Sequence, residues 1–137
     1  MEQLAWNDGL SIGVAEIDAQ HKHLIDLVNV VARAVEKHEG QEVAGAALRS
    51  LCDYAVEHFA AEEMLMDMDT YPEYDLHVTE HMDCTQKALD FLQTYSEGQE
   101  VNMPEFVSFL AGWVHTHIME VDQTLGRHLK ARGIGTA

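Results

Sequence analysis

The chain has 137 residues, 47% of them hydrophobic, and it carries a formal charge of −16. This length suits a single core, so we expect residues 1–137 to form one domain. The negative charge argues against nucleic acid or an anionic membrane surface as a partner. The sequence has neither a basic start before an apolar run nor a stretch of ~20 apolar residues, so we expect a cytoplasmic protein without a membrane span. Cys52 and Cys84 are interpreted as reduced thiols in or near the core.

The N-terminal residues 1–17 have no steady periodicity, which predicts an irregular arm that packs over the rest of the domain. Asp18 is a suitable cap for a first helix over about 18–37. Apolar residues recur along this segment at helical spacing, and His21 lies on their face in the first turn. His23 points about 200° away from that face, so we expect it to be solvated.

Three further helices are expected from the periodicity of the remaining sequence, over about 42–67, 72–97 and 104–125. The start of the last helix is marked by Asn102 as a side-chain cap, with Pro104 at an early helical position and Glu105 three residues after the cap. Four helices of roughly 20 to 26 residues joined by short links predict an all-α fold, an up-down-up-down antiparallel four-helix bundle.

Two pairs of candidate metal ligands share the same spacing. His58 and Glu62 form one pair, and His77 and His81 form the other. A spacing of four residues places two side chains about 40° apart on one face of a helix. Both pairs lie on the apolar faces of their helices, where an unpaired carboxylate costs several kcal/mol. A bound cation therefore explains the two pairs better than ordinary packing, which remains the alternative for either pair alone.

The fourth helix offers two histidines as partners for one carboxylate. His115 and Asp122 are seven residues apart and nearly aligned, whereas His117 and Asp122 are five apart and about 140° out of phase in a regular helix. His117, however, extends the apolar face that contains Trp113, and His115 does not. If His117 and Asp122 both reach the core, we expect the helix to be widened locally, as in a π-bulge.

Taken together, these residues resemble the hemerythrin family, most closely its single-domain bacterial members, over almost the whole chain. The resemblance is carried by Ile17-Asp18-Ala19-Gln20-His21, His58-Phe59-x-x-Glu62, His77-x-x-x-His81 and Trp113-x-x-x-His117-Ile118-x-x-x-Asp122. It favours His117 over His115 and implies a non-haem di-iron centre (Fe²⁺/Fe³⁺) in the bundle core.

The resemblance also assigns roles to the residues at this centre. The family's seven ligand positions are matched here by His21, His58, Glu62, His77, His81, His117 and Asp122. The last three histidines would hold a saturated iron, and the first two would hold an iron with one open position for O₂ or a small anion. The two carboxylates would bridge the irons together with an oxo or hydroxo group. An apolar O₂ pocket, with ordinary core packing as the alternative, would be formed by Phe59, Trp113, Val114 and Ile118.

These features predict a protein that binds O₂ reversibly and serves as an oxygen carrier, store or sensor. One alternative is a di-iron enzyme that reduces peroxide or nitric oxide, and another is an O₂- or redox-sensing signalling module. The sequence contains no Glu-x-x-His pair of the kind used by ferritin-like di-iron enzymes. A carboxylate-rich site that activates oxygen is therefore disfavoured.

Overall fold

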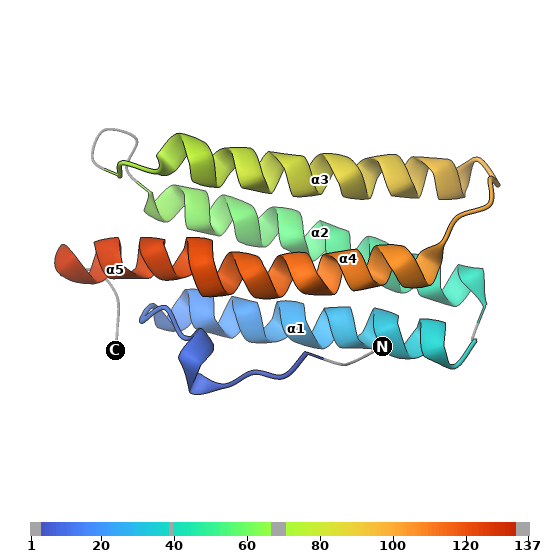
Figure 1. Cartoon of the computed structure of the whole chain (residues 1–137), viewed down its shortest axis with the longest axis horizontal. Coiled ribbons are helices and arrows are strands. Elements are labelled where there is room, and N and C mark those ends of the chain that lie inside the picture. The colour runs from blue at the N-terminus through green and yellow to red at the C-terminus, as the bar shows by residue number, and fades with distance from the viewer. Residues whose placement is uncertain (1–3, 39, 67–70, 134–137) are drawn as a thin grey trace.

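The computed structural model describes residues 4–38, 40–66 and 71–133 and consists of long helices lying side by side (Figure 1). The α-helices are α1 (Ala15–Glu36), α2 (Gln41–Leu65), α3 (Tyr74–Ser96), α4 (Met103–Thr116) and α5 (Gln123–Ala131), and a short 3-10 helix, η1 (Asp8–Leu10), precedes them. A π-helical segment, His117–Asp122, joins α4 to α5, and the three form one continuous rod. No strand occurs in these ranges, so the predicted all-α four-helix bundle is confirmed.

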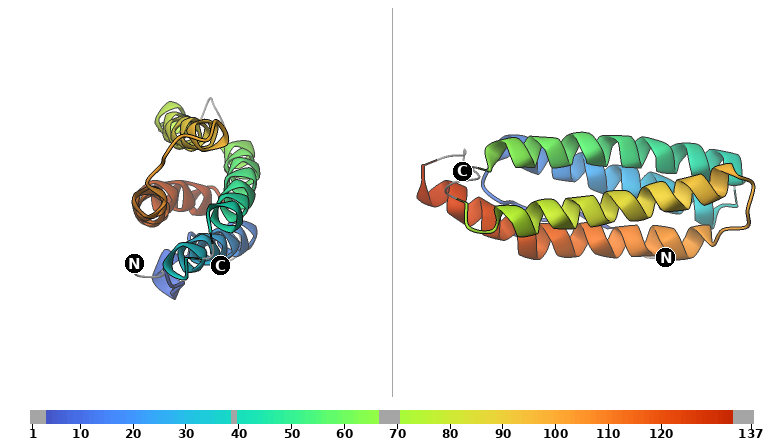
Figure 2. Two further views of the ribbon diagram at one scale, coloured as in Figure 1. Left: turned by 90° about the vertical axis from the view of Figure 1, so that its right-hand side faces the viewer. Right: turned by 90° about the horizontal axis from the view of Figure 1, so that it is seen from above.

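The four rods alternate in direction (Figure 1), and the end-on view in Figure 2 shows them placed around a common interior. α1 packs against α2 and α4, and α2 also packs against α3. Within the described ranges, no helix is long and apolar enough to cross a membrane. The start of α4 agrees with its sequence signal, because the Asn102 side chain accepts a hydrogen bond from the Glu105 backbone N–H at 3.0 Å and donates one to Glu105 Oε2 at 3.1 Å. The first bond satisfies one backbone N–H of the first turn, and the second holds the capping side chain in place.

The expected start of the first helix was wrong. α1 begins at Ala15, and Val14 occupies its cap position without a side-chain hydrogen bond. Asp18 instead accepts hydrogen bonds from the Ser11 hydroxyl and, at 2.9 Å, from the Ile12 backbone N–H. Asp18 therefore fastens the arm to the first turn of α1, where its negative charge also suits the positive end of the helix dipole.

Other helix ends also differ from the expected ranges or lie outside the described residues. α2 ends at Leu65, and the residues expected to form the break after it, 67–70, are outside the described ranges. The last rod extends beyond the expected residue 125 to Ala131. Its extension is explained by Leu125 and Leu129, which are both buried and continue the apolar face into α5.

The N-terminal arm lies along α1 and reaches α5 (Figure 1). Leu4 and Asn29 of α1 exchange two hydrogen bonds, from the Leu4 N–H to Asn29 Oδ1 at 2.9 Å and from Asn29 Nδ2 to the Leu4 carbonyl at 2.8 Å. Gln123 Nε2 donates to the Ser11 carbonyl at 3.1 Å. Leu10 of the arm is itself buried in the larger apolar cluster, so the arm covers part of the core.

The interior contains two apolar clusters with a polar layer between them. One cluster includes Leu24, Leu51 and Val114, and the other, at one end of the bundle, includes Ile17 and Leu125. The buried polar and charged residues are His21, His58, Glu62, His77, His81, His117 and Asp122. Along each rod they fall between members of the two apolar clusters. All four rods therefore contribute polar side chains to the same level of the bundle.

Candidate metal centre

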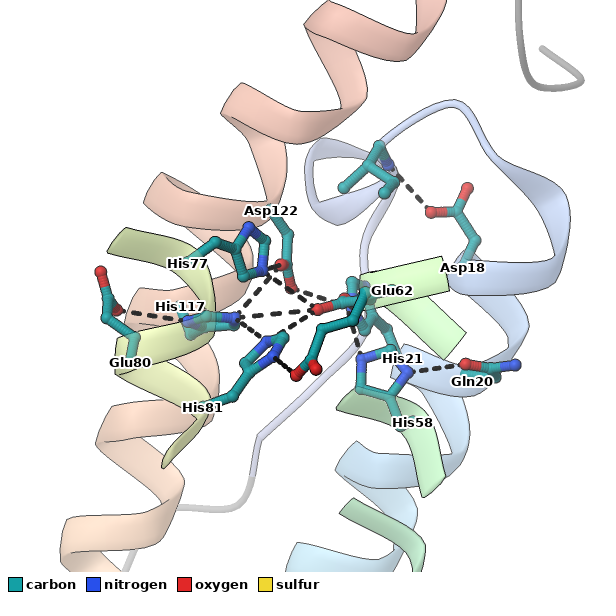
Figure 3. Close-up of polar contacts among 12 residues, drawn as sticks. Asp18, Gln20, His21, His58, Glu62, His77, Glu80, His81, His117 and Asp122 are labelled. Atoms are coloured by element: carbon teal, nitrogen blue, oxygen red, sulfur yellow. Dashed lines mark hydrogen bonds and ion pairs between the residues drawn. The ribbon is translucent and has the colours of Figure 1, made fainter. Parts of the chain in front are cut away.

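The seven residues of this polar layer are the seven ligand candidates expected from the sequence, and all converge at the centre of the bundle (Figure 3). They are between 0% and 3% exposed. α1 provides His21, α2 provides His58 and Glu62, and the other four come from α3 and the π-helical segment. Burying so many polar groups without partners would be costly, so their convergence indicates a bound ligand.

The convergent atoms form two groups that share their carboxylates. In each group, one ligand atom per residue lies within 4.8 Å of all the others. The larger group consists of Glu62, His77, His81, His117 and Asp122, and the smaller consists of His21, His58, Glu62 and Asp122. The two groups thus offer donors for two ions, and they share both carboxylates.

The two oxygens of Glu62 point to different groups. Glu62 Oε1 lies 3.0 Å from His81 Nε2 and 3.3 Å from His77 Nε2. Glu62 Oε2 lies 2.9 Å from Nε2 of both His21 and His58. One carboxylate therefore offers one oxygen to each group.

Asp122 divides its oxygens in the same way. Its Oδ1 lies 3.1 Å from His77 Nε2 and 3.2 Å from His117 Nε2, while its Oδ2 lies 3.0 Å from His21 Nε2. Despite these distances, neither Asp122 oxygen makes a hydrogen bond of acceptable geometry. Both oxygens are hydrogen-bond acceptors that are almost completely buried, and both point into the interior of the cluster. They are thus positioned for cations rather than for hydrogen-bond donors.

The imidazole nitrogens also favour metal binding. His81 Nε2 and His117 Nε2 lie 3.1 Å apart, so two ring nitrogens face each other in a buried site. Five imidazoles and two carboxylates exceed the four ligands of one tetrahedral zinc site. Imidazole and carboxylate together suit iron and similar transition metals. The donor set therefore fits a pair of iron ions.

The π-helical segment explains how one helix supplies two ligands five residues apart. His117 and Asp122 are its first and last residues, and both are buried. A π-turn contains more residues than an α-turn, so it brings this spacing onto one face. The expected local widening of the fourth helix is confirmed. His115, the alternative partner by α-helical period, is exposed.

Three of the five histidines are oriented by side chains that contact the ring nitrogen facing away from the centre. His58 Nδ1 lies 2.7 Å from Gln20 Oε1, and His81 Nδ1 lies 2.9 Å from Glu63 Oε2. His117 Nδ1 lies 3.3 Å from Glu80 Oε1. When Nδ1–H donates to these oxygens, the lone pair of Nε2 is directed at the centre.

Sequence reasoning did not identify Gln20, Glu63 or Glu80 as part of the site. Each is next to a ligand candidate in the chain, and neighbours on a helix point about 100° apart. Their contacts with rings from other helices depend on how the helices pack. The only sequence signal is that each is a hydrogen-bond acceptor next to a candidate ligand.

The electrostatics of the unloaded cluster couple its histidines to its carboxylates. Burial alone would lower the pKa of His21, but its close contacts with the negative carboxylates of Asp122 and Glu62 outweigh burial and raise this pKa to about 9. Burial likewise opposes protonation of His117, but the negative charge of Asp122, whose Oδ1 lies 3.2 Å from His117 Nε2, raises the pKa of His117 to about 10. Burial would raise the pKa of Glu62, yet the surrounding histidines hold it well below its ordinary value. Without metal, protons on the histidines therefore balance the carboxylates.

Aromatic side chains fix two of the rings and border a cavity. Phe59 stacks on His81 with 4.1 Å between ring centroids, and Trp113 stacks on His117 at 4.4 Å. A cavity of about 100 Å³ lies beside the cluster. The four residues expected to form an apolar pocket all line it: Phe59, Trp113, Val114 and Ile118.

The remaining histidines described by the structure lie outside the cluster. His23 is exposed, as expected, and its ring contacts Tyr54 at 4.5 Å between centroids. His128 packs beside Tyr71 at 4.8 Å. Cys52 and Cys84 are free thiols, and both line the cavity.

The fold and the cluster define a four-helix bundle with a buried histidine–carboxylate centre able to hold metal. A family model described as the hemerythrin HHE cation binding domain matches residues 12–129. The chain belongs to the hemerythrin family, which confirms the resemblance inferred from its motifs.

Relatives support this assignment over nearly the full length of the chain. A bacteriohemerythrin of Methylococcus capsulatus is 32% identical over 90% of this chain and 92% of its own length. Another, from Stenotrophomonas maltophilia, is 30% identical over 96% of this chain and 84% of its own. A crystal structure of wild-type hemerythrin superposes with a TM-score of 0.82 at 26% identity, covering 92% of this chain and 97% of that one.

Proposed function

We propose that the protein binds O₂ reversibly at a non-haem di-iron centre and serves as an oxygen carrier, store or sensor. The observation that carries this proposal is that Glu62 and Asp122 each direct one oxygen to each of the two histidine groups. His77, His81 and His117 then hold one iron, and the remaining two histidines hold the other. When bound, a ferrous pair would supply the electrons for reversible O₂ binding.

The unequal number of donors supports an open position at one iron. The larger group supplies three histidines and two carboxylate oxygens, whereas the smaller supplies two histidines and two carboxylate oxygens. The cavity is lined by both histidines of the smaller group, His21 and His58, but by only His117 of the larger. A small ligand in the cavity therefore approaches the side with fewer donors.

The chemistry of the cavity favours an oxygen-binding protein over an enzyme. Most of its lining is apolar, including Leu24, Phe59 and Ile118. The Thr85 hydroxyl, which also lines it, donates to the His81 carbonyl at 2.8 Å. Burial raises the pKa of the Cys84 thiol to about 12, so this thiol retains its proton. A cavity with few available proton donors favours release of O₂ over its further reduction.

The proposal is tested by the visible spectrum of anaerobically reduced protein before air, after air, and after removal of the gas. We expect two irons per chain, uptake of about one O₂ per iron pair, and return of the colourless state under argon. One zinc per chain without iron would contradict the proposed centre. Rapid one-way oxidation, with many turnovers of peroxide or nitric oxide at the expense of a reductant, would instead support the enzyme.

A further inference from the structure

The hydrogen bonds behind the ligand histidines are distributed unequally between the two groups. In the larger group, His81 and His117 face the carboxylates of Glu63 and Glu80. In the smaller group, His58 faces the uncharged amide of Gln20. Figure 3 shows Glu80 and Gln20 on opposite flanks of the cluster.

The other two histidines do not cancel this difference. Nδ1 of His21 and Nδ1 of His77 are both buried and have no hydrogen-bond partner among the described residues. Each group therefore contains one histidine without a partner at Nδ1. The contrast between the groups consists of two carboxylates against one amide.

A carboxylate and an amide have different effects on a metal-bound imidazole. Both accept Nδ1–H and fix the orientation of the ring, but a negative acceptor draws the proton more strongly and makes Nε2 a stronger donor to the metal. A stronger donor stabilises the more highly charged ion. Glu63 and Glu80 are 32% and 33% exposed, so solvent weakens their fields without removing the direct contacts.

We propose that Glu63 and Glu80 are positioning residues that favour the ferric state of the iron at His77, His81 and His117. Gln20 is uncharged, so the iron held by His21 and His58 lacks this bias. The two irons therefore differ in how strongly their surroundings favour the ferric state. This inference rests on the di-iron centre of the proposed function. It goes beyond that function by naming the side chains that set the preferred oxidation state of each iron.

The central test replaces charge while keeping shape. Glu63→Gln and Glu80→Gln retain an oxygen acceptor for the ring N–H but lose the negative charge. We expect each to shift the ferric/ferrous equilibrium about tenfold toward ferrous, which is about 59 mV for a one-electron couple. The shift is measured by spectroelectrochemical titration under argon. Ferric iron should also be lost faster to a chelator, because outer hydrogen-bond partners typically contribute about 10–100-fold to metal affinity.

The reverse substitution and two controls separate hydrogen bonding from general charge. Gln20→Glu should shift the equilibrium toward ferric. Glu57→Gln and Asp83→Asn each remove an exposed carboxylate from α2 or α3, and both should leave the potential close to that of the unaltered protein. The inference is overturned if Glu63→Gln and Glu80→Gln shift the potential no more than these controls, or if Gln20→Glu shifts it in the same direction as they do.

These measurements are made without O₂, so they separate this inference from the proposed function. If the protein holds two irons but does not release O₂, the carrier function is wrong, and the measured potentials still decide whether the two glutamates act as proposed. If O₂ binding is reversible and the potentials are unchanged, the function stands and this inference is wrong.

Discussion

His117 Nε2 lies 3.2 Å from Asp122 Oδ1, although these residues would point about 140° apart on a regular α-helix. The π-helical segment that they delimit removes this difference in phase. His115 is better aligned with Asp122 by α-helical period, yet it is exposed. The widened turn thus determines which histidine of the last rod faces the carboxylates.

The first prediction concerns these two histidines. His117→Ala should markedly lower the iron content, because it removes a buried donor of the larger group. His115→Ala should leave it unchanged, because this side chain is exposed. Both are measured by metal analysis of protein purified after iron-replete expression. Loss of iron in His115→Ala with retention in His117→Ala would show that the α-helical period, and not the π-turn, describes the loaded protein.

A second prediction concerns the bridging role proposed for Glu62. Glu62→Gln keeps the side-chain volume but removes one negative charge and one good oxygen donor. We expect a folded protein that loses iron to a chelator faster than the unaltered protein does. The neighbouring Glu63→Gln serves as a comparison, because it alters only an outer contact and should have the smaller effect. Equal rates of iron loss in the two variants would argue against a direct ligand role for Glu62.

Much of this site could be predicted from sequence because its chemistry follows helical periodicity. The spacing of four in His58/Glu62 and His77/His81 placed each pair on one face, and the apolar residues around them indicated the core. Periodicity left the choice between His115 and His117 open, and the family motif decided it. The role of Asp18 was assigned wrongly, because capping and fastening the arm use the same carboxylate chemistry. Whether Asp18 caps the helix or binds the arm depends on the path of the residues that precede it.

A third prediction concerns the metal-free protein and pH. The pKa values of His21 and His117 are raised from 6.5 to about 9 and about 10. The folded protein therefore holds protons more tightly than the unfolded chain, and this contribution to stability is complete below about pH 6.5 and lost as pH rises through 9 and 10. The pKa values of Glu62 and Asp122 are lowered, so their contribution is present above the ordinary carboxylate range and lost as pH falls.

Metal-free protein should thus be most stable at about pH 5–6.5 and lose stability toward pH 10. Urea unfolding at a series of pH values measures this dependence. His21→Gln should flatten the alkaline decline, whereas the exposed His115→Gln should not. Stability that rises between pH 7 and 9 would show that these histidines are not preferentially protonated in the fold.

A fourth prediction links metal loading to the same protons. Histidine must be neutral to ligate, so loading ferrous iron at pH 7 should release protons from the raised-pKa residues, His21 and His117. Loading should also stabilise the fold by mass action, by about 2.7 kcal/mol when free metal is at 100 times its Kd. Anaerobic titration in a weak buffer with a pH indicator measures the protons, and melting curves measure the stability. Coincident melting curves for metal-free and loaded protein would place the binding site outside the core.

The last prediction concerns how closely the N-terminal arm is seated on the final rod. A Cβ at Gly126 of α5 would collide with the Ile12 backbone carbonyl oxygen and come within 2.8 Å of the Ile12 Cβ. Backbone atoms cannot move aside as a flexible side chain can, so Gly126→Ala should destabilise the fold by about 1–3 kcal/mol.

Gly112, on the same rod, is the control, because no atom lies within 4 Å of such a Cβ. Gly112→Ala should therefore stabilise the protein by up to about 1 kcal/mol, the helix-propensity difference. Urea unfolding of both variants in the metal-free state makes the comparison. If the two variants have equal stability, residues 11–14 do not pack on α5 as described, and the hydrogen bonds of Asp18 to the arm would not serve to hold it against this rod.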